Sequence, residues 1–362
     1  MRVIVIGSGI GGASTAYHLA LHGADVVVVD ADRAGAATDA GAGIVSPWTS
    51  TWDDAVYPLA AAAGRYYPVL AAELSEAGHD SSYEVVGGMV VSALEEELTA
   101  AYDRLVQRVA DAPEAGAVER LDAGQARELF PPLAPELAGV HLSGAGRVDG
   151  QVLRRALISA AIDRGVEFVT AEASLAPGLR VRAGAEELTG DAVVLAAGAW
   201  SGQVAEALGV PVPVSPQRGQ ISHFDLPGAD TGAWPVVLPR SSHYLLAFAG
   251  GRVVAGATRE SGAGFDHRVT AAGQREVLEQ ALGVAPGLGE AGLVETRVGF
   301  RPASPDGLPL LGQVAAGLYL ATGFGPSGLT LGPVAGKLVA ELVLGVDVPG
   351  ELLAGCGPGR FA

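Results

Sequence analysis

The strongest constraint on the fold is a glycine-rich turn between two short apolar runs at the N-terminus. Residues 3–6 are rich in β-branched side chains, and the turn GSGIGG follows at 7–12. Residues 13–22 then have helical apolar spacing, and a second apolar run at 26–29 ends at Asp30. Strand, glycine turn, helix, strand and acid in this order are typical of a βαβ unit that binds a dinucleotide.

Each glycine of the turn has a separate physical task. Gly7 allows a tight turn, Gly9 lets a pyrophosphate approach the backbone, and Gly12 lets the helix pack closely on the sheet. The unpaired N–H groups at the start of the helix favour a phosphate. Asp30 stands where a carboxylate accepts hydrogen bonds from ribose hydroxyls, which indicates FAD or NAD rather than NADP. A structural turn that binds nothing is the alternative.

Composition limits the partners and the location of the protein. The 362-residue chain carries a formal net charge of −17, which disfavours nucleic acid and anionic membrane surfaces as partners. No apolar run is long enough for a transmembrane helix, so we expect a cytoplasmic protein. The single cysteine, Cys356, excludes an internal disulfide and a cysteine-cluster metal site, and we expect no bound metal.

The rest of the chain contains a loop of small residues, a second strand that leads into a glycine turn, and further predicted helices and strands. Residues 31–46 are dense in alanine and glycine, as expected of a flexible loop or of a loop pressed against a flat cofactor. A buried strand at 192–196 runs into a second glycine turn and suits the same parallel sheet as the first strand. Further predicted elements are helices at 53–78, 94–109, 125–129, 151–164, 270–282 and 333–344, strands at 85–92, 166–170 and 318–321, and a hairpin at 244–257.

Seven stretches together resemble the D-amino-acid oxidase superfamily of flavoproteins, especially its glycine oxidase-like and D-amino-acid dehydrogenase-like branch. They are the N-terminal turn with Asp30, ATDAGAGIV, VVLAAGAW, PQRGQ, VVAGAT, GFRPASPDGLPLLG and GFGPSGLTLGPVAGKLVAEL. The resemblance implies an α/β fold, with a Rossmann-type FAD-binding domain interrupted by an antiparallel α+β substrate domain. The corresponding ranges are 1–83, 141–212 and 300–362 for FAD, and 84–140 and 213–299 for the substrate.

The resemblance also assigns cofactor-binding residues. They belong to the N-terminal turn and its acid, the loop after it, the second glycine turn and the segment before the last helix. They are Gly7, Ser8, Gly9, Ile10, Gly11, Gly12, Asp30, Ala31, Thr38, Asp39, Ala40, Gly41, Ala42, Gly43, Ile44, Ala197, Gly198, Trp200, Gly323, Phe324, Gly325, Pro326, Ser327, Gly328, Leu329 and Thr330. Cys356 lies after the last helix and no histidine lies in residues 38–52, so we expect non-covalent FAD.

Three residues are candidates for contact with the substrate. Arg301 matches the arginine that holds a substrate carboxylate in the glycine oxidase-like branch, and a guanidinium offers a bidentate fit to that group. A structural salt bridge or a surface charge is the alternative for Arg301. His243 and Tyr244 begin the hairpin strand that would wall the pocket, unless they are a solvated histidine and a packed aromatic residue. Arg240, Trp48 and His223 are weaker candidates, whereas His18 and Lys337 are expected to be structural or solvated.

The resemblance implies oxidation of a C–N bond. The first reading is an oxidase or dehydrogenase that converts a D-amino acid, glycine or an N-substituted amino acid to an imine by hydride transfer to flavin N5, with oxygen or another acceptor reoxidising the flavin. A flavoenzyme acting on a larger biosynthetic intermediate is the second reading, and a non-catalytic flavin-binding subunit of a complex is the third. The oligomeric state is left open.

Overall fold

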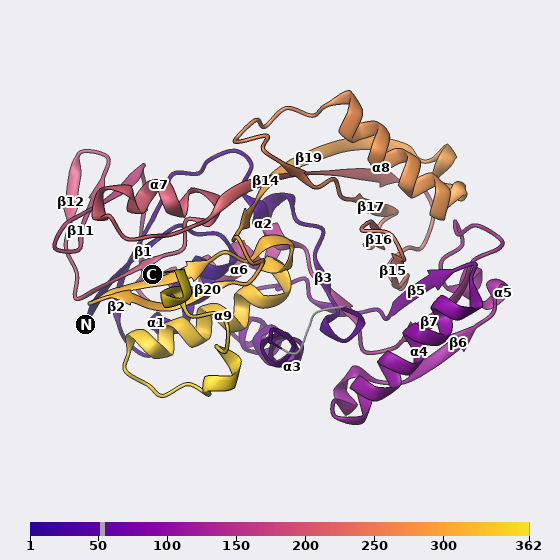
Figure 1. Ribbon diagram of the computed structural model, residues 1–362, viewed down its shortest axis with the longest axis horizontal. Coiled ribbons are helices and arrows are strands. Elements are labelled where there is room, and N and C mark those ends of the chain that lie inside the picture. The colour runs from indigo at the N-terminus through magenta and orange to yellow at the C-terminus, as the bar shows by residue number, and fades with distance from the viewer. Residues whose placement is uncertain (51–54, 362) are drawn as a thin grey trace.

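The computed structural model describes residues 1–50 and 55–361, and a largely parallel sheet forms the larger of its two lobes (Figure 1). The sheet has the strand order β20-β21-β13-β1-β2-β9, and only the β20–β21 pairing is antiparallel. Its strands are β1 (Arg2–Ile6), β2 (Asp25–Asp30), β9 (Glu167–Thr170), β13 (Ala192–Leu195), β20 (Leu310–Ala315) and β21 (Leu318–Thr322). This arrangement confirms the predicted Rossmann-type α/β fold.

Both faces of this sheet are covered, which explains why its strands are nearly continuous apolar runs. Val3 and Val5 face a core made with α1 (Ile10–Leu21), α3 (Tyr57–Glu76), α6 (Gly150–Ile162) and α9 (Gly328–Val343). Ile4 and Ile6 face the opposite core. That core is completed by α7 (Ser201–Ala205) and a small sheet of β10 (Ala173–Ala176), β11 (Arg180–Ala183) and β12 (Glu186–Leu188).

The second lobe contains a larger sheet, in which the pairings are antiparallel except that of β5 with β15. Its strands are β5 (Gly88–Ser92), β6 (Val118–Leu121), β7 (Ala138–Leu142), β14 (Ser215–Asp225), β15 (Val236–Pro239), β16 (Tyr244–Ala247), β17 (Arg252–Gly256), β18 (Glu260–Ser261) and β19 (Gly292–Ala303). The helices of this lobe are α4 (Glu95–Ala110), α5 (Ala123–Leu129) and α8 (Ala271–Val284). The long strands β14 and β19 run side by side toward α8 (Figure 1).

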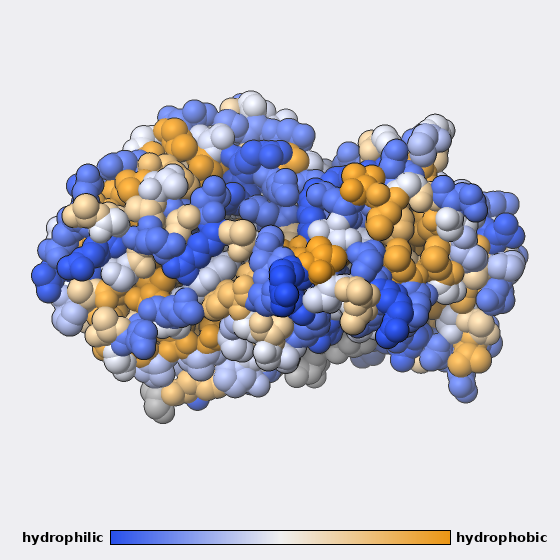
Figure 2. Space-filling model, turned by 90° about the horizontal axis from the view of Figure 1, so that it is seen from above, coloured by the Kyte–Doolittle hydropathy of each residue, from blue (hydrophilic) through white to orange (hydrophobic). Residues whose placement is uncertain are grey.

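Short elements connect the two lobes. The turn α2 (Ala37–Ala40) contacts β19, and β3 (Ile44–Val45) and β4 (Glu84–Val85) both pair with β8 (Gly146–Arg147). A space-filling view shows the narrower waist between the lobes, with hydrophobic residues at the surface of both (Figure 2). None of the helices in the described ranges is long and apolar enough to cross a membrane.

The predicted elements are present, but several of their bounds differ. The helices predicted from 13 and from 125 begin earlier, at Ile10 and Ala123. The strand predicted at 85–92 is divided into β4 and β5 at Gly87, which has a φ of +81°. The helix predicted at 53–78 begins at Tyr57, and its expected start at Asp53 lies outside the described residues. The start of the last helix also differs from the prediction. The domain boundaries at 83, 140, 212 and 299 stay a prediction, and the last of them falls within β19.

The predicted start of the last helix at Pro333 is wrong. The helix α9 begins at Gly328, so Pro333 lies in its interior. A proline there leaves the carbonyl four residues earlier, that of Leu329, without its helical N–H donor. The buried Tyr67 hydroxyl donates a hydrogen bond to that carbonyl. A side chain from α3 therefore compensates for the missing donor, an interaction that local sequence does not reveal.

We expect the change Tyr67→Phe to destabilise the protein by about 1–3 kcal/mol, because it leaves the buried Leu329 carbonyl without a donor. The free energy of unfolding from denaturant titration measures this loss. Tyr83→Phe is the control, because Tyr83 packs on the Tyr67 ring at 5.0 Å and its hydroxyl has no hydrogen bond among the described residues. Equal effects of the two changes would contradict the compensation of Pro333 by Tyr67.

Candidate active site

A cavity of about 720 Å³ runs between the two lobes. At one end it is lined by Asp30, at the tip of β2, and at the other by Arg301, on β19. Ligand pockets in proteins span roughly 300–1,000 Å³, so the cavity is large enough for an extended ligand. Most of the predicted cofactor-binding residues line it, together with Arg301, Tyr244 and His243. The predicted residues that do not line it are Ser8, Gly12, Asp39, Ala40 and Gly323.

The N-terminal turn has the shape that a pyrophosphate needs. A Cβ on Gly7 would lie 2.4 Å from the Ala196 carbonyl oxygen, and one on Gly12 would lie 1.9 Å from the Gly7 carbonyl oxygen. These two glycines therefore allow close packing within the protein. Gly9 differs, because the nearest atom to its added Cβ is Thr38 Oγ1 at 3.4 Å, and Gly9 lines the cavity. The space beside Gly9 is thus left to a ligand, which fits a bound FAD.

Charged groups surround the adenosine end that the turn implies. The Asp30 carboxylate accepts hydrogen bonds from the backbone N–H groups of Ser8 and Asp32. Arg33 and Glu172 line the same end and form an ion pair there. Arg154 donates to the Ser8 carbonyl at 2.8 Å. Sequence reasoning missed the last three residues, because no local pattern brings 33, 154 and 172 to the end of β2.

The predicted flavin-ring loop and the last helix meet in the middle of the cavity. The Thr330 hydroxyl donates to the Ile44 carbonyl at 2.9 Å, which ties α9 to β3. The first turn of α9, at Gly328, lines the cavity, and its N–H groups have no partners within the helix. The positive end of the helix dipole favours negative charge on a ligand at this point.

Arg301 lies at the opposite end of the cavity and is held flat against a strand. Its Nη1 donates to the Thr258 carbonyl at 2.9 Å. A Cβ on Gly219, the glycine of PQRGQ, would lie 2.7 Å from both Nη atoms, so this glycine makes room for the guanidinium. Burial lowers the pKa of Arg301, and an arginine remains charged even so.

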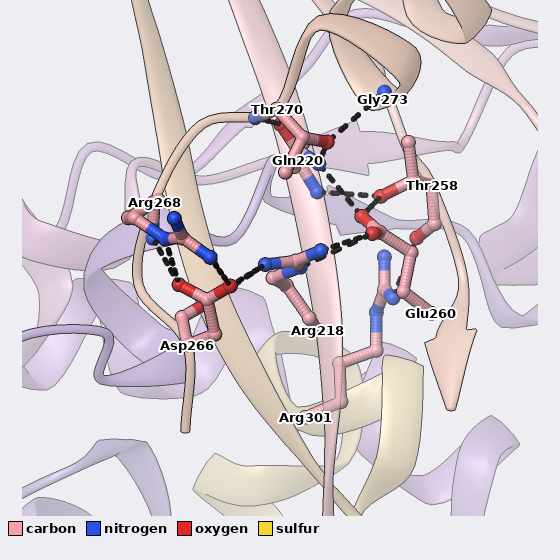
Figure 3. Close-up of polar contacts among 9 residues, drawn as sticks. All are labelled: Arg218, Gln220, Thr258, Glu260, Asp266, Arg268, Thr270, Gly273 and Arg301. Atoms are coloured by element: carbon pink, nitrogen blue, oxygen red, sulfur yellow. Dashed lines mark hydrogen bonds and ion pairs between the residues drawn. The ribbon is translucent and has the colours of Figure 1, made fainter. Parts of the chain in front are cut away.

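A polar network stands behind Arg301 (Figure 3). The Glu260 carboxylate accepts hydrogen bonds from Arg218 Nη2 at 2.6 Å, Gln220 Nε2 at 2.7 Å and the Thr258 hydroxyl at 2.7 Å. Burial alone would raise the pKa of Glu260, but these hydrogen bonds outweigh it and the pKa is lowered. Arg218 also pairs with Asp266 at 3.0 Å. The network fixes Thr258, whose carbonyl accepts from Arg301.

Tyr244 and His243 lie beside Arg301 on the cavity wall. Burial raises the pKa of the Tyr244 hydroxyl, and the nearby cations Arg301 and Arg259 oppose that rise. Burial also lowers the pKa of His243, whose Nε2 lies 3.4 Å from Glu276 Oε1 on α8. A neutral tyrosine hydroxyl next to a guanidinium can donate to the same anion.

The weaker candidates differ in their positions. Arg240 lines the cavity, whereas Trp48 is buried in a separate core beside it. His223 lies 3.9 Å from Glu295 and does not line the cavity. Burial lowers the pKa of His18 to about 4. Lys337 pairs with Glu341 on the surface of α9, and neither residue lines the cavity.

Two cavity arginines were not predicted. Arg104, on α4, and Arg259, after β17, also line the cavity. Arg104 belongs to a helix with many charged residues, and Arg259 follows the end of a strand. Nothing in the local sequence therefore indicates that either residue lines a cavity. Cys356 does not line the cavity, and burial raises its pKa to about 11.

Comparisons with known proteins agree with this arrangement. The model of the family described as FAD dependent oxidoreductase (DAO) matches residues 2–342. The uncharacterized oxidoreductase YurR of Bacillus subtilis is 48% identical over 94% of each chain. A glycine oxidase of Pseudomonas aeruginosa is 32% identical over 95% of each. The crystal structure of an iminodiacetate oxidase, IdaA, from Chelativorans sp. BNC1 superposes with a TM-score of 0.95 at 46% identity over 99% of each chain. The chain therefore belongs to the DAO family of FAD-dependent oxidoreductases and is an enzyme.

Proposed function

We propose that this enzyme oxidises the C–N bond of a small amino acid to an imine, and that N-substituted amino acids are its preferred substrates within that class. The observation that carries the proposal is the position of Arg301 and Tyr244 on one wall of the cavity that begins at the dinucleotide-binding turn. The relatives named above include a glycine oxidase and an iminodiacetate oxidase, which makes glycine, sarcosine and iminodiacetate the first compounds to try.

In this proposal the residues of the chain act by binding and orientation. Bound FAD supplies the two-electron oxidant, which takes a hydride from the substrate carbon. The backbone at Gly9 and the N-terminus of α1 would hold the pyrophosphate, and Asp30 would hold the ribose. The guanidinium of Arg301 and the hydroxyl of Tyr244 hold the substrate carboxylate and so fix the Cα–H bond.

The remaining steps need no acid or base from the protein. The substrate nitrogen must first lose its proton, so that its lone pair can form the C=N bond as the hydride leaves. Hydrolysis of the imine by one water gives an oxo acid and an amine. Oxygen or another acceptor then takes the two electrons. We propose a cytoplasmic location and non-covalent binding of FAD, with the remaining cofactor contacts as the resemblance assigns them.

The visible spectrum of the purified protein tests this function. We expect an oxidised-flavin spectrum that is bleached under anaerobic conditions by at least one member of a panel of glycine, sarcosine, iminodiacetate, proline and D-amino acids. Denaturation in acid should release the flavin into solution, as expected for non-covalent FAD. A flavin that none of these compounds reduces would contradict the proposed reaction.

A further inference from the structure

The side of the cavity that the smaller lobe forms carries more positive charge than one carboxylate requires. Arg301, Arg259, Arg240 and Arg104 all line it, and all four come from the elements of the smaller lobe. The acidic residues in the described lining are Asp30 and Glu172, which both lie at the adenosine end. Such a concentration of arginine in a chain with a net charge of −17 indicates an anionic ligand.

The acids near these arginines do not neutralise all of them. Arg240 lies 3.7 Å from Glu97, which provides its counter-ion. Glu260, the residue that follows Arg259, is turned toward Arg218, Gln220 and Thr258 (Figure 3). Within residues 1–50 and 55–361, neither Arg301 nor Arg259 forms an ion pair with a carboxylate. Their charges are therefore available to a bound ligand.

Arg301 and Arg259 are close enough to act on one small molecule. Arg301 Nη1 donates a hydrogen bond to the carbonyl of Thr258, the residue before Arg259, and both arginines line the cavity together with Tyr244 and His243. Arg301 is partly buried, whereas Arg259 is exposed, and both line the cavity. A ligand that reached from one to the other would place one anionic group deep in the cavity and a second nearer to solvent.

We propose that Arg259 binds a second carboxylate, so that the enzyme is specific for secondary amines that carry a carboxylate on each nitrogen substituent. This inference rests on the proposed function, in which Arg301 and Tyr244 hold the carboxylate next to the oxidised carbon. The second carboxylate then lies beyond the nitrogen, toward the cavity mouth. A monocarboxylate leaves the Arg259 charge without a partner, whereas a dicarboxylate satisfies both guanidinium groups.

The chemistry of this substrate class follows from the reaction already proposed. Oxidation removes a hydride from one carboxymethyl carbon and a proton from the nitrogen, and FAD receives the two electrons. Water then cleaves the C=N bond, so that one arm leaves as an oxo acid and the other remains as a primary amino acid. Arg301 holds the arm that is oxidised, and Arg259 holds the arm that keeps the nitrogen.

Two ethers that cannot undergo amine oxidation test the binding of the second carboxylate. Diglycolate has a carboxylate on each side of its oxygen, and methoxyacetate has one. We expect calorimetry on the FAD-loaded enzyme to show that diglycolate binds about 10- to 100-fold more tightly than methoxyacetate, as charged hydrogen bonds of this kind predict. In Arg259→Gln this advantage should disappear while methoxyacetate binding stays within about twofold.

Control variants separate this role from a general effect of charge. Arg275→Gln removes an exposed arginine on α8 that pairs with Glu279, and it should leave both affinities unchanged. Arg259→Lys should retain part of the preference, because it keeps the charge but not the planar geometry. Two results would overturn the assignment to Arg259. The first is an Arg259→Gln variant that binds neither diglycolate nor methoxyacetate. The second is a diglycolate preference that Arg240→Gln removes and Arg259→Gln retains.

The outcome also distinguishes this inference from the proposed function. If a monocarboxylate amine bleaches the flavin but diglycolate binds no better than methoxyacetate, the second-carboxylate inference fails and the reaction stands. If no amine bleaches the flavin, the proposed function fails, whatever the two ethers show.

Discussion

Arg301→Ala is expected to lower kcat/KM for an amino-acid substrate by about 100-fold or more, mainly through a higher KM. Two charge-assisted hydrogen bonds to a carboxylate, each contributing about 1.5–3 kcal/mol, account for a factor of this size. The loss is large because the Tyr244 hydroxyl, the other group that we assign to the carboxylate, is a single neutral donor. Thr258 offers its carbonyl to Nη1, and Gly219 leaves the space for the planar group.

Anaerobic stopped-flow reduction of the flavin separates binding from the chemical step in this variant. We expect a much weaker substrate dissociation constant and a smaller change in the reduction rate at saturation. Arg301→Lys should lie between wild type and Arg301→Ala, since it keeps the charge and loses the bidentate geometry. An unchanged KM in Arg301→Ala would remove Arg301 from the substrate site and leave it as a structural residue.

Gly219→Ala tests the role of Arg301 without changing Arg301 itself. Its Cβ would lie 2.7 Å from both Nη atoms, which the side chain can relieve only by moving. We expect kcat/KM to fall by about 10- to 100-fold, as misplaced binding groups commonly cause. Gly283→Ala, on α8, is the matched control because an added Cβ there meets no atom within 4 Å.

The sequence predicted best what local chemistry determines. The βαβ unit with its three glycines and Asp30 is encoded within one short stretch, and the structure has the predicted elements there. The hairpin of β16 and β17 was predicted for the same reason, since alternation around Gly250 and Gly251 specifies it. Local patterns were sufficient wherever the interacting residues are neighbours along the chain.

Other features depend on pairings between distant segments. Gln217 of β14 stands opposite Arg301 of β19, and this register brings the PQRGQ glycine under the guanidinium. Arg259 reaches the cavity only because β17 pairs with both β14 and β16. The sequence predicts a helix start at Pro333 because proline favours the first turn of a helix, whereas the donor that compensates for it inside α9, Tyr67, lies on α3. Contacts of this kind join segments that are distant along the chain, so the apolar periodicity of a single sequence does not reveal them.

Gly9→Val is expected to abolish FAD binding at working concentrations, with a loss in affinity of about 100-fold or more. Gly9 has a φ of −60°, which valine adopts without strain, and an added Cβ comes no closer to the protein than 3.4 Å. The valine side chain would therefore occupy only the space that we assign to the pyrophosphate. Fluorescence titration of the apoprotein with FAD measures the affinity, and circular dichroism checks the fold.

Gly12→Ala provides the contrast that decides how the turn works. Its Cβ would lie 1.9 Å from the Gly7 carbonyl oxygen, so the helix α1 must move away from β1 and the apoprotein itself should lose about 1–3 kcal/mol of stability. Gly9→Val should keep the stability of the apoprotein and lose FAD. If both variants destabilise the apoprotein and the Gly9 variant still binds FAD tightly, the glycines of the turn serve only the packing of α1 on β1. If instead Gly12→Ala lowers the stability of the apoprotein and Gly9→Val lowers only the affinity for FAD, the phosphates of the cofactor lie at Gly9. The valine side chain would then conflict with the ligand and not with the protein.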